Sequence, residues 1–304
     1  MMSLMKLMRI VAILAYATII ISSISWAGEC QNWQATHPEW LFCDDFEDST
    51  SLVRQGRYFE YDNGSGSFIL SNGVGLNSSK GMKASWQLGQ VNAGALRLAF
   101  GRNPVADKGI RSSENFREIY YRMYVRTQAG WIGDPVKLSR ATIFSASDWS
   151  QAMIAHLWSG DVSGYLGVDP VRCVDGAGNV ICSGYNDFAH MTWLGLSVGK
   201  TPIYDSAHNN LWYCVEAHVR LNDPGQSNGM QEFLIDGQLE ARKVNLNFVG
   251  SYSAYGINSI SFENYWNTGS IQQQERYFDN IVVSMHPIGC LSKTPTPPTN
   301  LKIY

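Results

Sequence analysis

The stretch Arg117-Glu-Ile-Tyr-Tyr-Arg-Met-Tyr-Val-Arg126 decides the fold class, because its side chains alternate in character. One set is largely apolar and consists of Ile119, Tyr121, Met123 and Val125. The other set is polar or aromatic and consists of Glu118, Tyr120, Arg122, Tyr124 and Arg126. A repeat of two residues is the period of a β-strand, whose successive side chains point to opposite faces of a sheet. The pattern therefore predicts a strand with one buried face and one polar, aromatic face.

Similar alternation recurs along the chain. It is found at 153–159, 213–221, 231–235, 257–266 and 276–285, and the dipeptide Asp236-Gly237 after the third of these is a tight-hairpin signal. Helical periodicity is nearly absent, and Gly, Asn, Asp and Ser separate the runs. Many short strands with such turns are typical of an all-β sandwich or jelly roll. We expect one such domain, spanning residues 28–290.

The 304-residue chain carries few charges. Charged residues make up 16% of it and the formal net charge is −3, whereas an average soluble protein has about 25% charged residues. A nucleic-acid-binding protein needs a basic face, so we expect no nucleic-acid partner. Aromatic residues make up 12%, with ten Trp and fifteen Tyr. A surface that is polar through Asn, Ser, Gln and Tyr suits polyhydroxyl ligands, and it also suits other exported β proteins.

The two ends of the chain differ from its middle. Lys6 and Arg9 precede an apolar run at 10–21, and Ser25-Trp26-Ala27 follows as a small-x-small cleavage site, which predicts a signal peptide at 1–27. The alternative is a membrane anchor, but the run is shorter than the about 20 residues that span a bilayer. We expect a secreted or periplasmic protein with no membrane partner after cleavage. Residues 291–304 contain Lys293-Thr-Pro-Thr-Pro-Pro-Thr299 and are expected to form a Pro-rich disordered tail.

Six cysteines follow the predicted cleavage site: Cys30, Cys43, Cys173, Cys182, Cys214 and Cys290. An even number of cysteines in an exported chain indicates disulfides. The middle pair encloses turn residues and can close a hairpin loop, while the first pair flanks a short N-terminal segment. The last pair is then left to join a late strand to the C-terminus. A zinc site is disfavoured, because the chain has no CxxC pair.

Three segments, taken in order, resemble parts of concanavalin A-like jelly-roll domains. Phe42-Cys-Asp-Asp-Phe-Glu-Asp48 is similar to their opening strand and Tyr277-Phe-Asp-Asn-Ile-Val-Val283 to their closing strand. The segment from Trp212-Tyr-Cys-Val-Glu216 through Ile235-Asp-Gly237 is similar to their outer-sheet hairpin. The set covers residues 40–290 and resembles the jelly-roll polysaccharide lyases of the glucuronan-lyase-like and heparin-lyase-like group. The resemblance implies a two-sheet antiparallel jelly-roll sandwich whose partner is a polysaccharide, most simply an acidic one.

The resemblance also implies a structural calcium ion where the first and last strands meet. The matching residues here are Asp45, Glu47 and Asp279. Ca²⁺ takes about six to eight oxygen ligands, which carboxylates and turn carbonyls supply. Asp44 adds a third acid beside Asp45 and Glu47, and such groups repel one another unless a cation or an arginine balances them. The alternative is that these acids cap surface turns.

A polysaccharide lyase needs three chemical functions. One group neutralises the uronate carboxylate, a base removes the neighbouring proton, and an acid protonates the departing glycosidic oxygen. The resemblance implies that these groups lie on the concave sheet. We assign His156 as the base, Tyr265 as acid or base and Arg122 as the carboxylate partner, with His190 as a further catalytic candidate. The sequence thus favours an exported lyase that cleaves a uronate-containing polysaccharide by β-elimination.

Candidate substrate-binding residues accompany these groups on the same strands, namely Tyr120, Trp158 and Glu263. The Trp158 ring can stack on a sugar. Other interpretations stay open, because a single histidine on a strand is commonly an ordinary hydrogen-bonded residue and Arg122 can pair with Glu118 across or along strands. The chain also lacks the Gln-x-His triplet and the Arg-x-Glu-x-Arg strand of alginate lyases. The alternative function is therefore a non-catalytic carbohydrate-binding or extracellular structural protein on the same fold.

Overall fold

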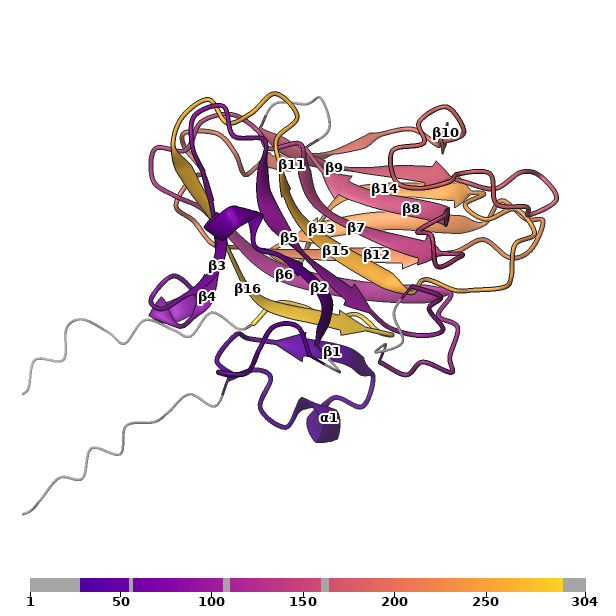
Figure 1. Cartoon of the computed structure of the whole chain (residues 1–304), viewed down its shortest axis with the longest axis horizontal. Helices are drawn as coiled ribbons and strands as arrows, with labels where there is room; N and C mark the ends of the chain where they lie inside the picture. Colours follow the sequence, from indigo (N-terminus) through magenta and orange to yellow (C-terminus); the bar gives the residue numbers. More distant parts are fainter. Residues whose placement is uncertain (1–27, 55–56, 106–109, 160–163, 292–304) are drawn as a thin grey trace, which may run out of the picture.

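A computed structural model describes residues 28–54, 57–105, 110–159 and 164–291. The predicted signal peptide and all but the first residue of the predicted Pro-rich tail lie outside these described residues. Regular structure in the described part is almost entirely β-strand (Figure 1). Helical turns there are short, comprising α1 (Trp33–Thr36), η1 (Gly64–Gly66) and η2 (Leu76–Ser78).

The strands form two antiparallel sheets. Sheet A has the order β14-β13-β12-β6-β16-β4-β3, and β1 also pairs with β16. Its strands are β14 (Gln238–Leu246), β13 (Gly229–Ile235), β12 (Tyr213–Arg220), β6 (Glu118–Thr127), β16 (Gln274–Ser284), β4 (Gly81–Trp86), β3 (Phe68–Ser71) and β1 (Trp40–Asp44). Strand β16, late in the chain, therefore pairs with the first strand, which brings the two ends of the domain together.

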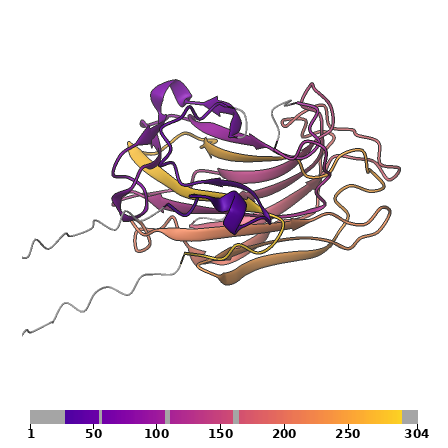
Figure 2. The ribbon, with the colours of Figure 1, turned by 90° about the horizontal axis from the view of Figure 1, so that it is seen from below.

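Sheet B has the order β10-β9-β8-β7-β15-β5-β2, and β11 also pairs with β9. Its strands are β10 (Thr192–Trp193), β9 (Tyr165–Arg172), β8 (Gln151–Trp158), β7 (Lys137–Phe144), β15 (Ser259–Tyr265), β5 (Asn92–Ala99), β2 (Tyr58–Asp62) and β11 (Ser197–Pro202). The chain crosses repeatedly between the two sheets, which makes the molecule a jelly-roll sandwich. Figure 2 shows the two sheets as two layers. The predicted fold class is confirmed.

The core lies between the two sheets and has the alternation expected from the sequence. The apolar set of β6, Ile119, Tyr121, Met123 and Val125, is at most 1% exposed. The Tyr121 ring meets Phe262 of sheet B edge-on, and its hydroxyl lies 3.2 Å from Ser139 Oγ of sheet B. Burying such large side chains on both inner faces is what holds two sheets together.

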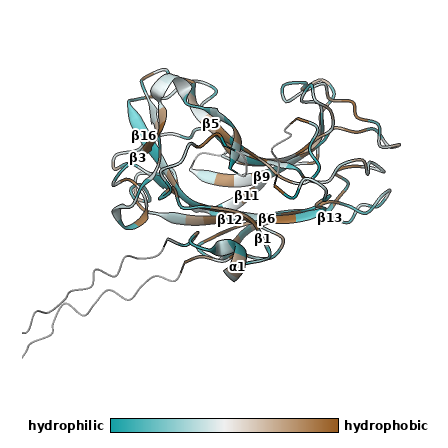
Figure 3. Cartoon of the chain, turned by 60° about the horizontal axis from the view of Figure 1, so that its bottom comes forward, coloured by the Kyte–Doolittle hydropathy of each residue, from teal (hydrophilic) through white to brown (hydrophobic). Residues whose placement is uncertain are grey.

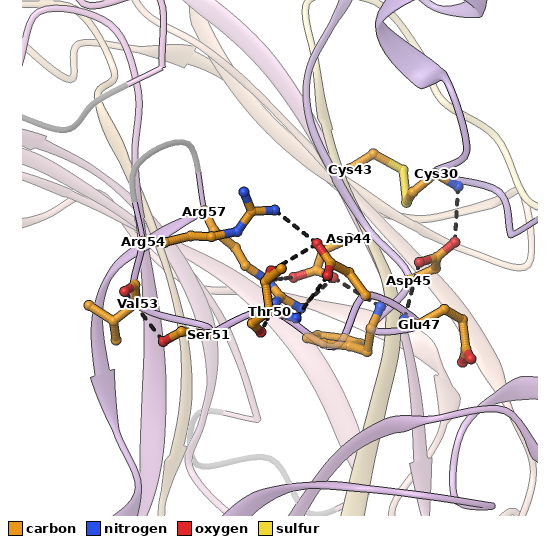
Figure 4. Close-up of polar contacts among 12 residues, drawn as sticks. Cys30, Cys43, Asp44, Asp45, Glu47, Thr50, Ser51, Val53, Arg54 and Arg57 are labelled. Carbon is orange, nitrogen blue, oxygen red and sulfur yellow. Dashed lines mark hydrogen bonds and ion pairs between the residues drawn. A yellow bond between two sulfur atoms is a disulfide. The ribbon is translucent and has the colours of Figure 1, made fainter.

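The N-terminal segment covers the outer side of sheet A. Figure 3 shows α1 next to β1; β1 pairs with β16, and Glu29 pairs with Arg122 of β6. Asp44 forms a two-pronged ion pair with Arg57, at 2.8 and 3.0 Å, and both side chains are buried (Figure 4). Arg57 is therefore the arginine that balances part of the acidic run. Burial raises the pKa of the Asp44 carboxyl, and the bonds from Arg57 oppose that rise.

All three predicted disulfides are present. They join Cys30 to Cys43, Cys173 to Cys182 and Cys214 to Cys290. The last bond spans 76 residues and closes the longest loop, and constraining a long loop in the unfolded chain stabilises the fold by about 4 kcal/mol. Within the described ranges, we find no helix that is both long and apolar enough to span a membrane.

Candidate active site

Two rows of side chains cross the outer face of sheet B, which is turned away from the core. The strand register places one row on β5, β15, β7, β8 and β9, in the order Arg97, Ser261, Arg140, His156 and Asp169. The adjacent row consists of Tyr265, Lys137 and Trp158 on β15, β7 and β8. Directly opposed residues on one face of a sheet have Cβ atoms about 5 Å apart. Sheet B therefore gathers cationic, aromatic and phenolic groups from distant parts of the chain.

A bulge in β7 brings Lys137 and Arg140 to the same face. Residues an odd number apart in a regular strand point to opposite faces. The register against β8 shifts between Lys137 and Ser139, and a bulge of this kind inserts an extra residue that resets the alternation. Both cations consequently line one cavity. Neither residue was predicted for the site from the sequence, where 137–144 was not among the predicted strands.

Two adjoining cavities lie over these rows. The aromatic cavity has a volume of about 440 Å³ and is lined by His156, Trp158, Asp169, Phe188 and Trp193, among others. The charged cavity has a volume of about 280 Å³ and is lined by Asp62, Arg97, Arg140 and Glu263, among others. Four residues line both: Lys137, Tyr185, Asn186 and Tyr265. A ligand that spans both cavities would therefore pass directly over these four side chains.

Lys137 stands between two tyrosine rings at this junction. Its Nζ lies 4.4 Å from the ring centre of Tyr185 and 4.4 Å from that of Tyr265. Within the described ranges, Lys137 forms no ion pair. Burial lowers the pKa of the Lys137 ammonium to about 8, because removing a charge from water favours the neutral amine. Lys137 can therefore accept a proton near neutral pH.

Arg140 lies beneath Tyr185 and is held by an acid. Its guanidinium carbon lies 3.5 Å from the Tyr185 ring centre, and Nη2 lies 3.2 Å from Glu263 Oε1. Its Nε and Nη1 atoms have no hydrogen-bond partner among the described residues. A buried guanidinium with spare N–H groups is suited to a carboxylate ligand, whose oxygens accept such bonds well. Burial also raises the pKa of the Tyr185 hydroxyl, so it stays protonated.

His156 is buried in a stack of aromatic rings. Its ring lies 4.2 Å from that of Trp158 and 5.6 Å from that of Trp193, in nearly parallel planes. Nδ1 lies 3.0 Å from the Asp169 carbonyl oxygen, which can only accept, so Nδ1 carries the hydrogen. Burial lowers the pKa of His156 to about 3, so the imidazole is neutral under physiological conditions.

A disulfide-braced loop carries Tyr185. The Cys173–Cys182 bond packs with Ile154, Val171 and Met191 in a small apolar cluster, and Tyr185 packs against this cluster. Ile154 is on the same face of β8 as His156 and Trp158, so the cluster adjoins the aromatic cavity. The sequence analysis predicted the disulfide but not Tyr185, because loop residues show no periodicity.

Arg276 supports the site from the core side. This fully buried arginine of β16 donates to the carbonyl oxygens of Glu263 at 2.7 Å and Lys137 at 3.1 Å. It also donates to Asn264 Oδ1 at 2.8 Å. These bonds fix the backbone of β15 and β7 where the two strands carry Tyr265 and Lys137.

Arg122 and Tyr120 do not lie at this site, and the expectation that they share a sheet with His156 is wrong. Both are on β6 of sheet A. Arg122 is 1% exposed, pairs with Glu29 and donates to the Gly289 carbonyl at 3.0 Å. Tyr120 stacks on His218 with ring centres 3.9 Å apart. The alternation correctly indicated a polar face, but it contained no information on which sheet the strand would join.

Of the other predicted site residues, some line the two cavities and one does not. Tyr265 and Trp158 stand in one row with Lys137, His156 stands in the adjacent row, and Glu263 lines the charged cavity. His190, by contrast, is more than half exposed, and its Nδ1 lies 2.7 Å from Asp187 Oδ1. It does not line either cavity, although the following residue, Met191, lines the aromatic one.

Two of the three residues predicted to bind calcium, Asp279 and Glu47, bond to the turn at 76–80. Asp279 Oδ2 accepts hydrogen bonds from Leu76 N and Ser79 Oγ, while Glu47 Oε1 accepts one from Lys80 N. Asp45 instead accepts from Cys30 N at 3.1 Å. Among the described residues no cluster of three or more His, Cys, Asp or Glu side chains could hold a metal. Asp279 is nevertheless fully buried and makes no ion pair with a described residue, and burial raises its pKa to about 7.

Comparison with known proteins identifies the fold but does not establish the activity. No family model matches the sequence, and no curated protein matches it. The structure is similar to an alginate lyase from Aplysia kurodai, with a TM-score of 0.52 and 15% identity over 80% of this chain and 98% of that one. It is also similar to an alginate lyase from Chlorella virus, with a TM-score of 0.50 and 11% identity over 82% and 94%.

An endo-β-1,4-glucuronan lyase from Trichoderma reesei matches with a TM-score of 0.48 and 12% identity, over 81% of this chain and 96% of that chain. The topology of the two sheets and the likeness to the two alginate lyases give the protein the jelly-roll fold that occurs in polysaccharide lyases, as the resemblance implied. At such identities the likeness establishes the fold, so the activity has to be argued from the side chains of the site.

Proposed function

We propose that the protein is an exported polysaccharide lyase that cleaves a uronate-containing polysaccharide by β-elimination at the junction of the two cavities. The observation that carries the proposal is the pairing of a proton acceptor, Lys137, with a phenol, Tyr265, on adjacent strands. Aromatic rings flank the pair on one side and guanidinium groups on the other. Three disulfides support export, because such bonds form in oxidising compartments.

Lys137 is the base in this proposal. A base is most effective when its pKa lies near the working pH, and that of Lys137 is about 8. His156, which the sequence suggested as the base, has a pKa of about 3 and holds a proton too weakly for this role. We assign His156 instead to the aromatic wall that positions the sugar.

Tyr265 is the acid. When Lys137 removes the proton at C5 of the uronate, the electrons form the C4–C5 double bond and the C4–O bond breaks. The Tyr265 hydroxyl gives its proton to the leaving oxygen, and the products are an unsaturated uronate and a new reducing end. The two residues are directly opposed in register, so they can act on adjacent atoms of one sugar.

Arg97 and Arg140 take the role that the sequence analysis gave to Arg122. Both line the charged cavity, and each has an N–H group without a partner among the described residues. Their ion pairs with Glu60 and Glu263 hold them in place. A carboxylate bound beside them is partly neutralised, which makes the neighbouring C–H more acidic.

The test is the ultraviolet absorbance of unsaturated uronate products on a panel of acidic polysaccharides. We expect it to rise with the wild-type protein and not with Tyr265→Phe. Tyr277→Phe is the matched control, since Tyr277 is on sheet A and its hydroxyl donates to Glu275 Oε2, away from both cavities. If no polymer gives a rise while oligosaccharides still bind, the protein is a carbohydrate-binding module on the same fold.

We also propose that a structural calcium ion joins the ends of the domain. Two observations support it: the buried Asp279 carboxylate makes no ion pair with a described residue, and Asp279 and Glu47 converge on the turn at 76–80. Backbone carbonyls of this turn would complete an oxygen ligand set. The ion would neutralise Asp279 and the nearby Asp45, and it has no part in the reaction.

A further inference from the structure

We infer that the site is built for a polymer in which a uronate alternates with an uncharged sugar, the uronate lying in the charged cavity and the uncharged sugar in the aromatic cavity. The inference rests on the proposed function and adds the class of substrate. The two cavities differ in charge and meet at Lys137, Tyr185 and Tyr265.

The charged cavity offers donors for one carboxylate. Arg97 and Arg140 line it, and Arg97 Nε together with Arg140 Nε and Nη1 lacks a partner among the described residues. Asn186 also lines this cavity, whereas the side-chain amides of Asn92 and Asn264 already donate to Asp62 and to the Gly94 carbonyl. A planar guanidinium recognises a carboxylate with two parallel bonds, so these groups select an acidic sugar.

The aromatic cavity has the opposite character. Apart from the shared Lys137, no described residue lining it is cationic, since His156 is held neutral in its ring stack. Its one acid is Asp169, in the same row as His156. A second uronate here would lie near this acidic residue, and the only cation among the described lining residues is Lys137, which is shared with the charged cavity, so burying a second carboxylate is disfavoured.

Its walls fit an uncharged sugar instead. Trp158 and Trp193 lie with ring planes within 13° of each other, and Phe188 is 61% exposed at the rim. Flat aromatic surfaces bind the apolar face of a pyranose ring, while Asn186 and Asn267 can bond to hydroxyl or acetamido groups. The aromatic cavity is also the larger of the two, so it accommodates a substituted sugar.

The decisive comparison uses two polymers that share glucuronate. Unsulfated chondroitin alternates glucuronate with an N-acetylated sugar, whereas polyglucuronate carries a carboxylate on every residue. We expect kcat/KM, measured by the absorbance of unsaturated products, to be at least about 10-fold higher on chondroitin, the equivalent of about 1.4 kcal/mol. A higher kcat/KM on polyglucuronate overturns the inference while leaving the lyase function intact.

Two variants test the cause of the preference. Asp169→Asn removes the carboxylate from the aromatic cavity and should raise kcat/KM on polyglucuronate several-fold, with little change on chondroitin. Trp193→Ala should lower kcat/KM on chondroitin about 10-fold and should lower kcat/KM on polyglucuronate much less. Leu88→Ala, at an exposed residue outside both cavities, is the control and should change neither. Equal effects on the two polymers would count against the inference.

The failure of the proposed function is recognised separately. If neither polymer gives unsaturated products, affinity electrophoresis of the wild-type protein in gels that contain each polymer still measures binding. Retardation by chondroitin that is lost in Trp193→Ala supports the inferred ligand class without catalysis. Retardation by polyglucuronate alone contradicts it.

Discussion

Lys137 on β7 is directly opposite Tyr265 on β15, and its Nζ lies 4.4 Å above the centre of the Tyr265 ring. The two strands belong to distant parts of the chain, and Arg276 holds the backbones of both from the core side. A proton acceptor and a proton donor are thus fixed in one row of a sheet. Such pre-organisation is the main requirement for a reaction that needs only proton transfers.

Removing either partner should abolish most of the elimination. We expect Lys137→Gln and Tyr265→Phe each to lower kcat by about 10²–10⁴-fold, the range typical of a lost acid or base. The double variant should be little worse than the slower single one, because the two residues act in one concerted step. Lys83→Gln on sheet A serves as the control. Full activity in Lys137→Gln would rule out the assigned base.

The rate should rise with pH. Lys137 acts as a base only when it is neutral, and its pKa is about 8. Below that value kcat/KM should therefore increase about tenfold per pH unit and should flatten above it. The profile is measured with polymer below KM in buffers of constant ionic strength. A rate that falls between pH 6 and pH 8 contradicts the role given to Lys137.

Acid should destabilise the fold through His156. Its pKa is about 3 in the folded protein, against 6.5 for a solvated histidine, so the unfolded chain binds the proton more tightly. The contribution of His156 to the free energy of unfolding is therefore fully present above pH 6.5 and decreases as the pH drops toward 3. At pH 5 about 2 kcal/mol of this free energy is lost. Urea unfolding of wild type and His156→Gln at pH 7 and pH 5 checks this. The free energy of unfolding of His156→Gln should decrease less between pH 7 and pH 5 than that of wild type. An equal decrease in both proteins would refute the role given to His156.

Removing calcium should lower the thermal stability. An ion present at 100 times its Kd stabilises a fold by about 2.7 kcal/mol, which corresponds to several degrees in Tm. We expect a chelator to lower the Tm of the wild-type protein and to leave that of Asp279→Asn unchanged. Glu60→Gln, an acidic residue of sheet B away from the turn at 76–80, should respond like wild type. A wild-type Tm that is insensitive to the chelator would show that the hydrogen bonds of the turn stabilise the buried Asp279 side chain without a calcium ion.

The fold could be predicted because its signals are local. The alternation of β6 indicated which side chains are buried, and the spacing of Cys173 and Cys182 indicated a closed hairpin. Tyr265, Trp158 and His156 were also proposed together, and they line one cavity. Each of these features depends on neighbours in sequence or on one strand face.

The remainder of the site depends on long-range pairing. Arg122 was expected beside His156, yet its strand joins sheet A, because period-two alternation distinguishes the faces of a strand but not the sheet to which it belongs. Lys137 and Arg140 were missed because β7 was not among the strands predicted from the sequence, and the bulge between them interrupts the alternation of that strand. Tyr185 is in a loop, where position is set by tertiary packing rather than by a repeat.

The Cys173–Cys182 bond has a consequence for how the junction of the two cavities is assembled. Tyr185 reaches the junction from a loop that this bond fastens beside Met191. A newly made chain in a reducing environment lacks that fastening, so one wall of the junction is not yet assembled. Oxidation of these two thiols is therefore a step in the assembly of the junction between the two cavities.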